Sequence, residues 1–170
     1  MHKHLQSIIG FFVIAYIAYN MLDVFFVSPP EIAPQITSEA YIDATGMEVS
    51  LSKYYGDYLW VDYAAEWCGY CTSQTSTIKS LEQNYADKLV FLTVVAGTDK
   101  VMDPPTADTA MNWARRFNLN PTKVLAQFST NTLPYHILYS PSGKILYQGS
   151  GLFNASQISN ILSTHTPLLN

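Results

Sequence analysis

Cysteine is scarce in this chain: Cys68 and Cys71 are the only two among 170 residues. A framework of several disulfides is therefore excluded, and so is a zinc site made of four cysteines. With no cysteine before residue 68, the sequence also argues against a lipid-modified cysteine as an anchor. Because Thr72 rather than histidine follows Cys71, the motif for covalent haem attachment is absent as well.

Basic charge is also sparse. Nine Lys and Arg stand against 13 Asp and Glu, the net charge is −4, and the basic residues are scattered along the chain. A nucleic-acid-binding domain normally carries a basic patch or stripe. We therefore expect no nucleic-acid partner.

One long apolar run is present, over residues 5–27, with Asp23 as its main charged interruption. A helix needs roughly 20 such residues to cross the hydrocarbon of a bilayer. We therefore expect a cytoplasmic N-terminus and transmembrane anchor over 1–28, an extended linker rich in proline over 29–39, and one domain over 40–170.

Flanking charges predict how the run is oriented. Lys3 precedes the run. Glu31 and Glu39 follow it, and no Lys or Arg occurs between the end of the run and Lys53. By the positive-inside tendency, we expect a single-pass protein of a bacterial inner membrane with its domain on the exported, periplasmic side. A cleaved signal peptide is the alternative, with a cleavage site near residues 13–15, but the apolar run continues well beyond that point.

The remaining sequence alternates between strand and helix patterns. We expect strands at 41–43, 47–49, 58–63 and 89–96, a helical turn at 51–55, and helices at 68–85 and 106–117. A hairpin of 135–139 with 144–147 follows. Asn154 and Gln157, three residues apart, resemble a capping box that opens a last helix to about 164. Met111, Ala114 and Phe117 are the expected packing residues of the second helix, and residues 121–128 are interpreted as an extra helical turn near the cysteines. This order predicts an α/β fold with a mixed central sheet covered by helices on both faces.

The two cysteines stand in Trp67-Cys68-Gly69-Tyr70-Cys71, directly after the strand at 58–63. Two intervening residues in the first turn of a helix bring both sulfurs within bonding reach. The first sulfur then faces the free N–H groups and the positive dipole end of the helix, where a thiolate is favoured. The sequence therefore predicts Cys68 as the attacking thiol and the more buried Cys71 as the resolving thiol.

Two other interpretations of the pair are weaker. A zinc site would need two more ligands, and only His136 and His165 are available in the expected domain. A purely structural disulfide would close so short a loop that it would hardly restrict the unfolded chain. We predict redox chemistry, with no metal and no cofactor beyond the redox-active Cys68–Cys71 disulfide.

Together these features resemble the thioredoxin superfamily, in particular its membrane-tethered exported branch of the TlpA, ResA and cytochrome c maturation type. The resemblance covers roughly residues 40–164. The segment 61–71 looks like the thioredoxin active-site block, Thr132-Leu133-Pro134 looks like its cis-proline loop, and Pro141-Ser142-Gly143-Lys144 is similar to its hairpin turn. It implies a three-layer thioredoxin-like fold.

The resemblance also implies roles for individual residues. Asp62 matches the buried acid beneath the second cysteine, which serves as general base for the resolving thiol; an ordinary strand aspartate is the alternative. Pro134 is expected to follow a cis bond, and Leu133 to pair its backbone with a substrate peptide. The other expected substrate-binding residues are Thr132, Trp67, Gly69 and Tyr70, the two aromatics forming an apolar rim.

The sequence departs from the thioredoxin pattern at three places. Tyr70 replaces the usual proline between the cysteines, Ala64 replaces a common tryptophan, and the strand at 89–96 has no lysine to pair with Asp62.

The predicted function is a membrane-tethered thiol–disulfide oxidoreductase that reduces disulfides of exported proteins. A membrane electron donor of the DsbD or CcdA kind, implied by the resemblance, would regenerate the dithiol.

One alternative is an exported oxidase or isomerase working in the opposite direction. Another is a non-enzymatic assembly or binding module, which Asp23 and residues 118–130 would suit. A copper chaperone fits less well, because the related fold uses a wider cysteine spacing and a suitably placed histidine.

Overall fold

The computed structural model describes residues 39–85, 89–97, 104–127 and 132–166. The expected transmembrane helix, and all but the last residue of the linker, lie outside the described residues. Within the described ranges, no helix has the length and apolar character that crossing a membrane requires.

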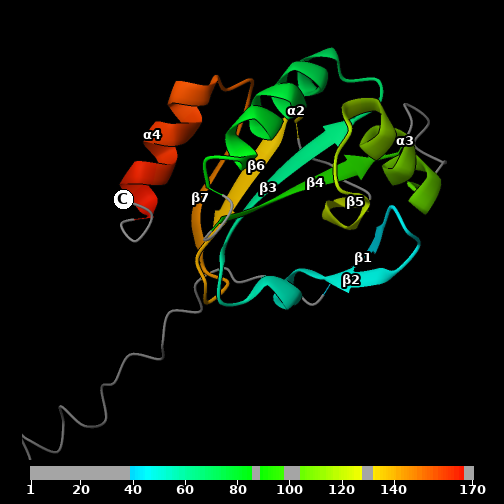
Figure 1. Ribbon diagram of the computed structural model, residues 1–170, viewed down its shortest axis with the longest axis horizontal. Helices are drawn as coiled ribbons and strands as arrows, with labels where there is room; N and C mark the ends of the chain where they lie inside the picture. Colours follow the sequence, from blue (N-terminus) through cyan, green and yellow to red (C-terminus); the bar gives the residue numbers. More distant parts are fainter. Residues whose placement is uncertain (1–38, 86–88, 98–103, 128–131, 167–170) are drawn as a thin grey trace, which may run out of the picture. The chain divides into compact units, whose positions relative to one another are not determined.

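Seven strands form one mixed sheet in the order β2-β1-β5-β4-β3-β6-β7. The strands are β1 (Ala40–Asp43), β2 (Glu48–Ser50), β3 (Tyr58–Ala65), β4 (Leu89–Ala96), β5 (Val124–Ala126), β6 (Tyr135–Tyr139) and β7 (Ile145–Ser150). The helices are α2 (Gly69–Glu82), α3 (Ala107–Phe117) and α4 (Ala155–His165), with 3-10 helices η1 (Leu51–Tyr54) and η2 (Pro121–Lys123) (Figure 1). The predicted α/β class with a mixed central sheet is confirmed.

The parallel pair β3 and β4 forms the centre of the sheet. Every residue of β3 is buried, and so is every residue of β4 except the half-buried Val90. Apolar, β-branched runs of this kind suit strands that are covered on both faces. β4 has the bounds that its sequence predicts, whereas β3 runs two residues further than expected, to Ala65.

The three α-helices pack on one face of this sheet (Figure 1). Trp60 of β3 belongs to a buried cluster with residues of α2 and α4, and Ala64 belongs to a second cluster with residues of α2 and α3. The connections β3-α2-β4 and β4-α3-β5 step across the sheet in the same direction. Because such crossovers are right-handed, α2 and α3 lie on the same side.

The packing residues of α3 were predicted only in part. Ala114 is buried as expected, but Met111 and Phe117 are half-buried, and Ala110 and Trp113 form the rest of the buried stripe. Residues 110, 113, 114 and 117 follow the i, i+3, i+4, i+7 spacing of one helix face, and Met111 is one step away from it.

The opposite face of the sheet has its own core. Leu59, Val61 and Tyr63 of β3 cluster there with Leu51 of η1 and with Tyr41 of β1. Among the described residues, a 3-10 helix and the β1–β2 hairpin contribute to this face, and all the longer helices lie on the other. The expected three-layer arrangement, with helices on both faces, therefore fails for the α-helices in the part of the chain that the structure describes.

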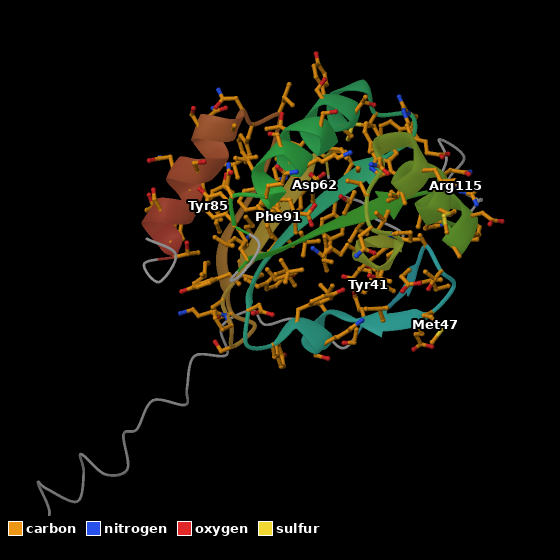
Figure 2. The ribbon with its side chains drawn as sticks, viewed as in Figure 1. Tyr41, Met47, Asp62, Tyr85, Phe91 and Arg115 are labelled. Atoms are coloured by element: carbon orange, nitrogen blue, oxygen red, sulfur yellow. A yellow bond between two sulfur atoms is a disulfide. The ribbon has the colours of Figure 1, made fainter. Side chains whose placement is uncertain are left out.

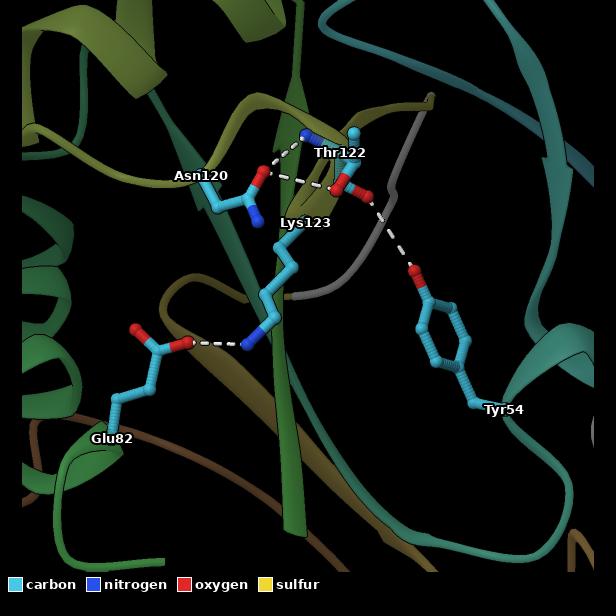
Figure 3. Close-up of polar contacts among 5 residues, drawn as sticks. All are labelled: Tyr54, Glu82, Asn120, Thr122 and Lys123. Carbon is cyan, nitrogen blue, oxygen red and sulfur yellow. Dashed lines mark hydrogen bonds and ion pairs between the residues drawn. The ribbon is translucent and has the colours of Figure 1, made fainter. Parts of the chain in front are cut away.

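The segment from Asn118 onward differs from its prediction. The expected helical turn over 121–128 is limited to η2, after which the chain forms β5, parallel to β4 and antiparallel to β1. Lys123 Nζ lies 2.6 Å from Glu82 Oε1, and Tyr54 donates a 3.5 Å hydrogen bond to the carbonyl of Thr122 (Figure 3). Glu82 is the last residue of α2, so these contacts hold η2 at the far end of that helix from the cysteines. The prediction of an extra turn near the cysteines is therefore wrong.

The C-terminal hairpin β6–β7 is confirmed, although β7 continues through Gly149 to Ser150. Its turn requires glycine at position 143, where φ is +80° and an added Cβ would lie 2.6 Å from the ring of Tyr55. The predicted capping box then opens α4: Asn154 and Gln157 accept each other's backbone N–H at 2.9 Å.

Candidate active site

The junction of β3 and α2 holds the two cysteines. Cys68 is the N-cap of α2, and its Sγ accepts a hydrogen bond of 3.2 Å from the backbone N–H of Cys71. The Cα atoms are 5.3 Å apart and the two sulfurs form a disulfide. The predicted placement of the Cys68 sulfur at the free N–H groups of the helix is therefore observed.

The two sulfurs differ in depth. Cys68 keeps 6% of its surface exposed, whereas Cys71 keeps none and points into the core shared by α2 and α3. A reagent that approaches from solvent meets Cys68 first. The geometry is compatible with the attacking and resolving roles, which stay predictions.

Two large aromatic side chains stand on either side of Cys68 in the sequence. Trp67 is 57% exposed and Tyr70 is 69% exposed, and Gly69 between them has no neighbour within 4 Å of an added Cβ. The tip of the site is therefore open and apolar.

The loop before β6 contributes the third part of the site. The Leu133–Pro134 peptide bond is cis, and Leu133 packs against the buried cluster that contains both cysteines. Pro134 is buried, Thr132 is exposed, and the carbonyl of Pro134 accepts the N–H of Gly151 at 2.9 Å. The tertiary fold thus brings Leu133 of this loop to the cluster that contains the cysteine pair.

Asp62 is fully buried on the helix-covered face of β3. By strand alternation it points to the same side as its neighbours Trp60 and Ala64, and Ala64 shares a cluster with Cys71. Figure 2 shows Asp62 where the sheet passes under α2. Burial raises the pKa of the Asp62 carboxyl above its usual range, and His136 only partly offsets this effect.

His136 is the site residue that sequence reasoning missed, because it was considered only as a metal ligand. It lies opposite Asp62 in the β3–β6 pairing, and its Nδ1 is 3.0 Å from Asp62 Oδ1. Neither side chain has any exposed surface. The sequence offered one signal: His136 follows the cis-proline by two residues, at the start of a strand that a hairpin directs alongside β3.

The ring of His136 is fixed on both sides. Its Nε2 lies 3.0 Å from the carbonyl oxygen of Gly151, and its centroid is 5.4 Å from that of Trp60 and 4.9 Å from that of Phe153. On the other neighbouring strand, β4, the residue opposite Asp62 is Thr93, which carries no charge. A histidine from β6 therefore pairs with the buried acid.

Gln74 ties the cysteine helix to the C-terminal part of the domain. Its side chain is fully buried, and Oε1 accepts a 2.7 Å hydrogen bond from the N–H of Phe153. The same short segment, 151–153, therefore contacts α2, His136 and the cis-proline loop.

For metals, the described residues bring together no group of three or more His, Cys, Asp and Glu side chains.

Comparison with known proteins agrees with this geometry. The sequence model of the thioredoxin family matches residues 45–106, a stretch that includes β3, both cysteines and β4. Over that stretch this chain matches the thioredoxin family, and its described fold is thioredoxin-like. No curated protein sequence matches it.

Solved structures with the same fold are numerous. The exposed lipoprotein thioredoxin Etrx1 of Streptococcus pneumoniae is 18% identical with a TM-score of 0.59, over 75% of this chain and 99% of that one. A thiol:disulfide interchange protein of Chlorobium tepidum is 13% identical with a TM-score of 0.62, over 84% and 100%. A DsbF homologue of Corynebacterium diphtheriae is 10% identical with a TM-score of 0.64, over 80% and 89%. At these identities the similarity establishes the fold.

The match to the thioredoxin family and the Cys68–Cys71 disulfide at the start of α2 identify the site as a centre of thiol–disulfide exchange. The chemistry that it can perform is transfer of a disulfide between this pair and the sulfurs of a partner.

Proposed function

We propose that this thiol–disulfide oxidoreductase is tethered to the membrane and reduces disulfides of exported proteins. The single observation that supports it best is the exposed edge of Cys68 at the N-terminus of α2, with Cys71 buried behind it and the cis-proline loop packed against the same cluster.

In the proposed cycle, the Cys68 thiolate attacks one sulfur of a substrate disulfide, and the other substrate sulfur leaves with the electron pair of the broken bond. Cys71 then loses its proton and attacks Cys68. The bond between Cys68 and the substrate breaks, and the second substrate sulfur leaves as a thiolate that solvent protonates. The substrate gains two electrons and Cys68–Cys71 is left oxidised.

The substrate surface is proposed to be Trp67, Gly69 and Tyr70 on one side and the 132–134 loop on the other. The open aromatic tip favours an unfolded or flexible protein segment over a small thiol. Leu133, next to the cis bond, would pair its backbone with that segment.

Reduction is favoured over oxidation by the buried Asp62, which can assist ionisation of the resolving thiol, and by the resemblance to the TlpA and ResA branch. A reductase in an oxidising compartment needs a supply of electrons, for which we propose a membrane donor of the DsbD or CcdA kind. The alternative is an oxidase or isomerase, since direction depends on the relative stability of the dithiol and disulfide forms.

The membrane tether is proposed from residues 5–27, which are long and apolar enough to cross a bilayer. Export is supported by two proteins with a similar fold. The Streptococcus pneumoniae structure is described as an exposed lipoprotein. A Mycobacterium tuberculosis structure, 10% identical with a TM-score of 0.59, is described as a secreted disulfide oxidoreductase.

The test uses single cysteine variants of the full chain. Cys68→Ala is expected to abolish reduction of insulin disulfides, whereas Cys71→Ala is expected to trap substrates as mixed disulfides that can be identified from the membrane fraction. Wild-type activity in both variants would exclude the mechanism. A reduction potential close to that of strong oxidants, measured against glutathione, would reverse the proposed direction.

A further inference from the structure

The contact of His136 with Gly151 fixes one of its protons. The Gly151 carbonyl oxygen lies 3.0 Å from Nε2 and can only accept a hydrogen bond. Nε2 therefore keeps its proton whether the ring is neutral or charged. Any change in the charge of His136 takes place at Nδ1, the nitrogen that faces Asp62.

At the contact with Asp62, one further proton can be shared between His136 Nδ1 and the Asp62 carboxylate. Nδ1 and Asp62 Oδ1 are 3.0 Å apart, the distance of an ion pair, although the approach is not that of a straight hydrogen bond. With both side chains fully buried, a proton on either atom is shielded from water. Asp62 Oδ2 has no hydrogen-bond partner among the described residues, so it is free to receive a proton.

The surroundings contain few other ionisable groups. On the face of the sheet to which Asp62 points, α2 buries the polar side chains of Gln74 and Thr75 and the thiol of Cys71, and only Cys71 ionises. β7 contributes Tyr147, which stacks on Trp60, and α4 contributes His165, whose ring lies 5.9 Å from that of Tyr147. Of the ionisable groups on these elements, Cys71 is the one that the exchange reaction must deprotonate, and it shares a buried cluster with Ala64, which points to the same side of β3 as Asp62.

We propose that His136 is the positioning residue for the resolving step: by holding the shared proton on Nδ1, it leaves the Asp62 carboxylate able to take the proton of Cys71. The inference rests on the proposed exchange reaction. Without a cation beside it, a buried carboxylate would already be protonated, and a protonated carboxyl is no base.

Charge is conserved through this step. Before it, Asp62 is negative, His136 positive and Cys71 neutral. After the proton moves to Asp62 Oδ2, Asp62 is neutral, His136 positive and Cys71 a thiolate, so the buried group keeps a net charge of zero. The thiolate then attacks Cys68 and expels the substrate sulfur with its electron pair. Asp62 returns its proton to Cys71 when a reductant regenerates the dithiol.

The experiment follows the two halves of the reaction separately, with the full reduced chain in detergent and the chromogenic aromatic disulfide DTNB. Attack by Cys68 releases one coloured thiolate, and resolution by Cys71 releases a second. Neither His136→Asn nor His136→Gln can carry a positive charge. The side-chain amide of His136→Asn keeps a neutral hydrogen-bond donor toward Asp62, and that of His136→Gln keeps one toward the Gly151 carbonyl. Both are expected to slow the second release by about tenfold or more and to move its pH profile, while the first release stays unchanged.

Controls separate proton transfer from simple packing. His165→Asn removes the nearby histidine of α4 and is expected to leave both phases unchanged. Asp62→Asn should slow the second phase as His136→Asn does, and the double variant should be no slower than either single one. The inference would be overturned if the double variant slowed the second phase by the product of the two single effects. It would also be overturned if both His136 variants kept the wild-type rate and pH profile of the second phase.

Two outcomes distinguish this inference from the proposed function. If the wild-type chain releases no second equivalent, the exchange mechanism itself fails. If the His136 variants do not fold, nitrogen NMR of the reduced wild-type chain decides instead. Protons on both ring nitrogens of His136 at neutral pH are expected, and an unprotonated Nδ1 would overturn the inference.

Discussion

The sulfur of Cys68 accepts a hydrogen bond from the backbone N–H of Cys71, the residue to which it is disulfide-bonded. The N-cap position thus aims the outer sulfur at the positive end of α2. When the disulfide is reduced, the same N–H and helix dipole remain to stabilise a Cys68 thiolate.

We therefore expect the two thiols of the reduced chain to differ sharply in reactivity. Cys68 should be alkylated by iodoacetamide at neutral pH faster than free cysteine, and Cys71, with no exposed surface, should remain unmodified in the folded chain. Mass spectrometry of timed samples measures both. A Cys68 that resists alkylation would remove the basis of the proposed cycle.

The exposed aromatics predict a separation between binding and chemistry. Trp67→Ala and Tyr70→Ala should raise KM for a protein substrate while leaving reaction with DTNB and the free energy of unfolding, within about 0.5 kcal/mol, unchanged. Tyr55→Ala is the matched control, since this tyrosine is 50% exposed but lies beside the β6–β7 turn at Gly143. Equal effects of all three substitutions on KM would contradict the assigned surface.

Asp62 and Asp43 predict opposite effects of pH on stability. The pKa of Asp62 is raised by burial, so the folded state holds its proton longer than the unfolded state does. Stability from this group is present below the ordinary pKa of 3.8 and is lost as pH rises through the folded value. Asp62→Asn should therefore lose less stability than wild type as pH rises through that window.

For Asp43, burial alone would raise the pKa, but hydrogen bonds from Thr45 and Met47 hold it below its usual range. Its stabilisation is present above 3.8 and is lost as pH falls through the folded value. Asp43→Asn should accordingly be less stable than wild type at neutral pH. Urea unfolding of the oxidised chain and both variants, from acidic to neutral pH, measures the two slopes, and slopes of the same sign would refute the assignment.

Gln74 predicts a purely structural effect. In Gln74→Leu, the partly buried N–H of Phe153 loses its acceptor at 2.7 Å, which should cost about 1–3 kcal/mol of the free energy of unfolding. Thr77→Ala, on the exposed side of α2, is the control and should change stability little. Chemical denaturation of both variants gives the comparison; unchanged stability in Gln74→Leu would mean that the contact contributes nothing.

Local patterns were sufficient for much of the fold. The apolar, β-branched run at 89–96 gave a strand with the right bounds, and Asn154 with Gln157 gave the start of the last helix, because both signals are set by a few neighbouring residues. The extra turn expected over 121–128 failed because the partners of β5 are β4 and β1, more than 20 residues away in the chain. Pairing with distant strands overrode a weak local preference.

The sequence by itself determined the reactive pair, since two cysteines at this spacing after a buried strand leave few other chemistries, and a family resemblance supplied Asp62 and the cis-proline loop. Only the tertiary structure decided that His136 is the partner of Asp62. The two residues are 74 positions apart, and their contact depends on which strand lies beside β3 and in which register. A shift of one residue in that antiparallel pairing would have turned His136 to the other face of the sheet, away from the buried acid.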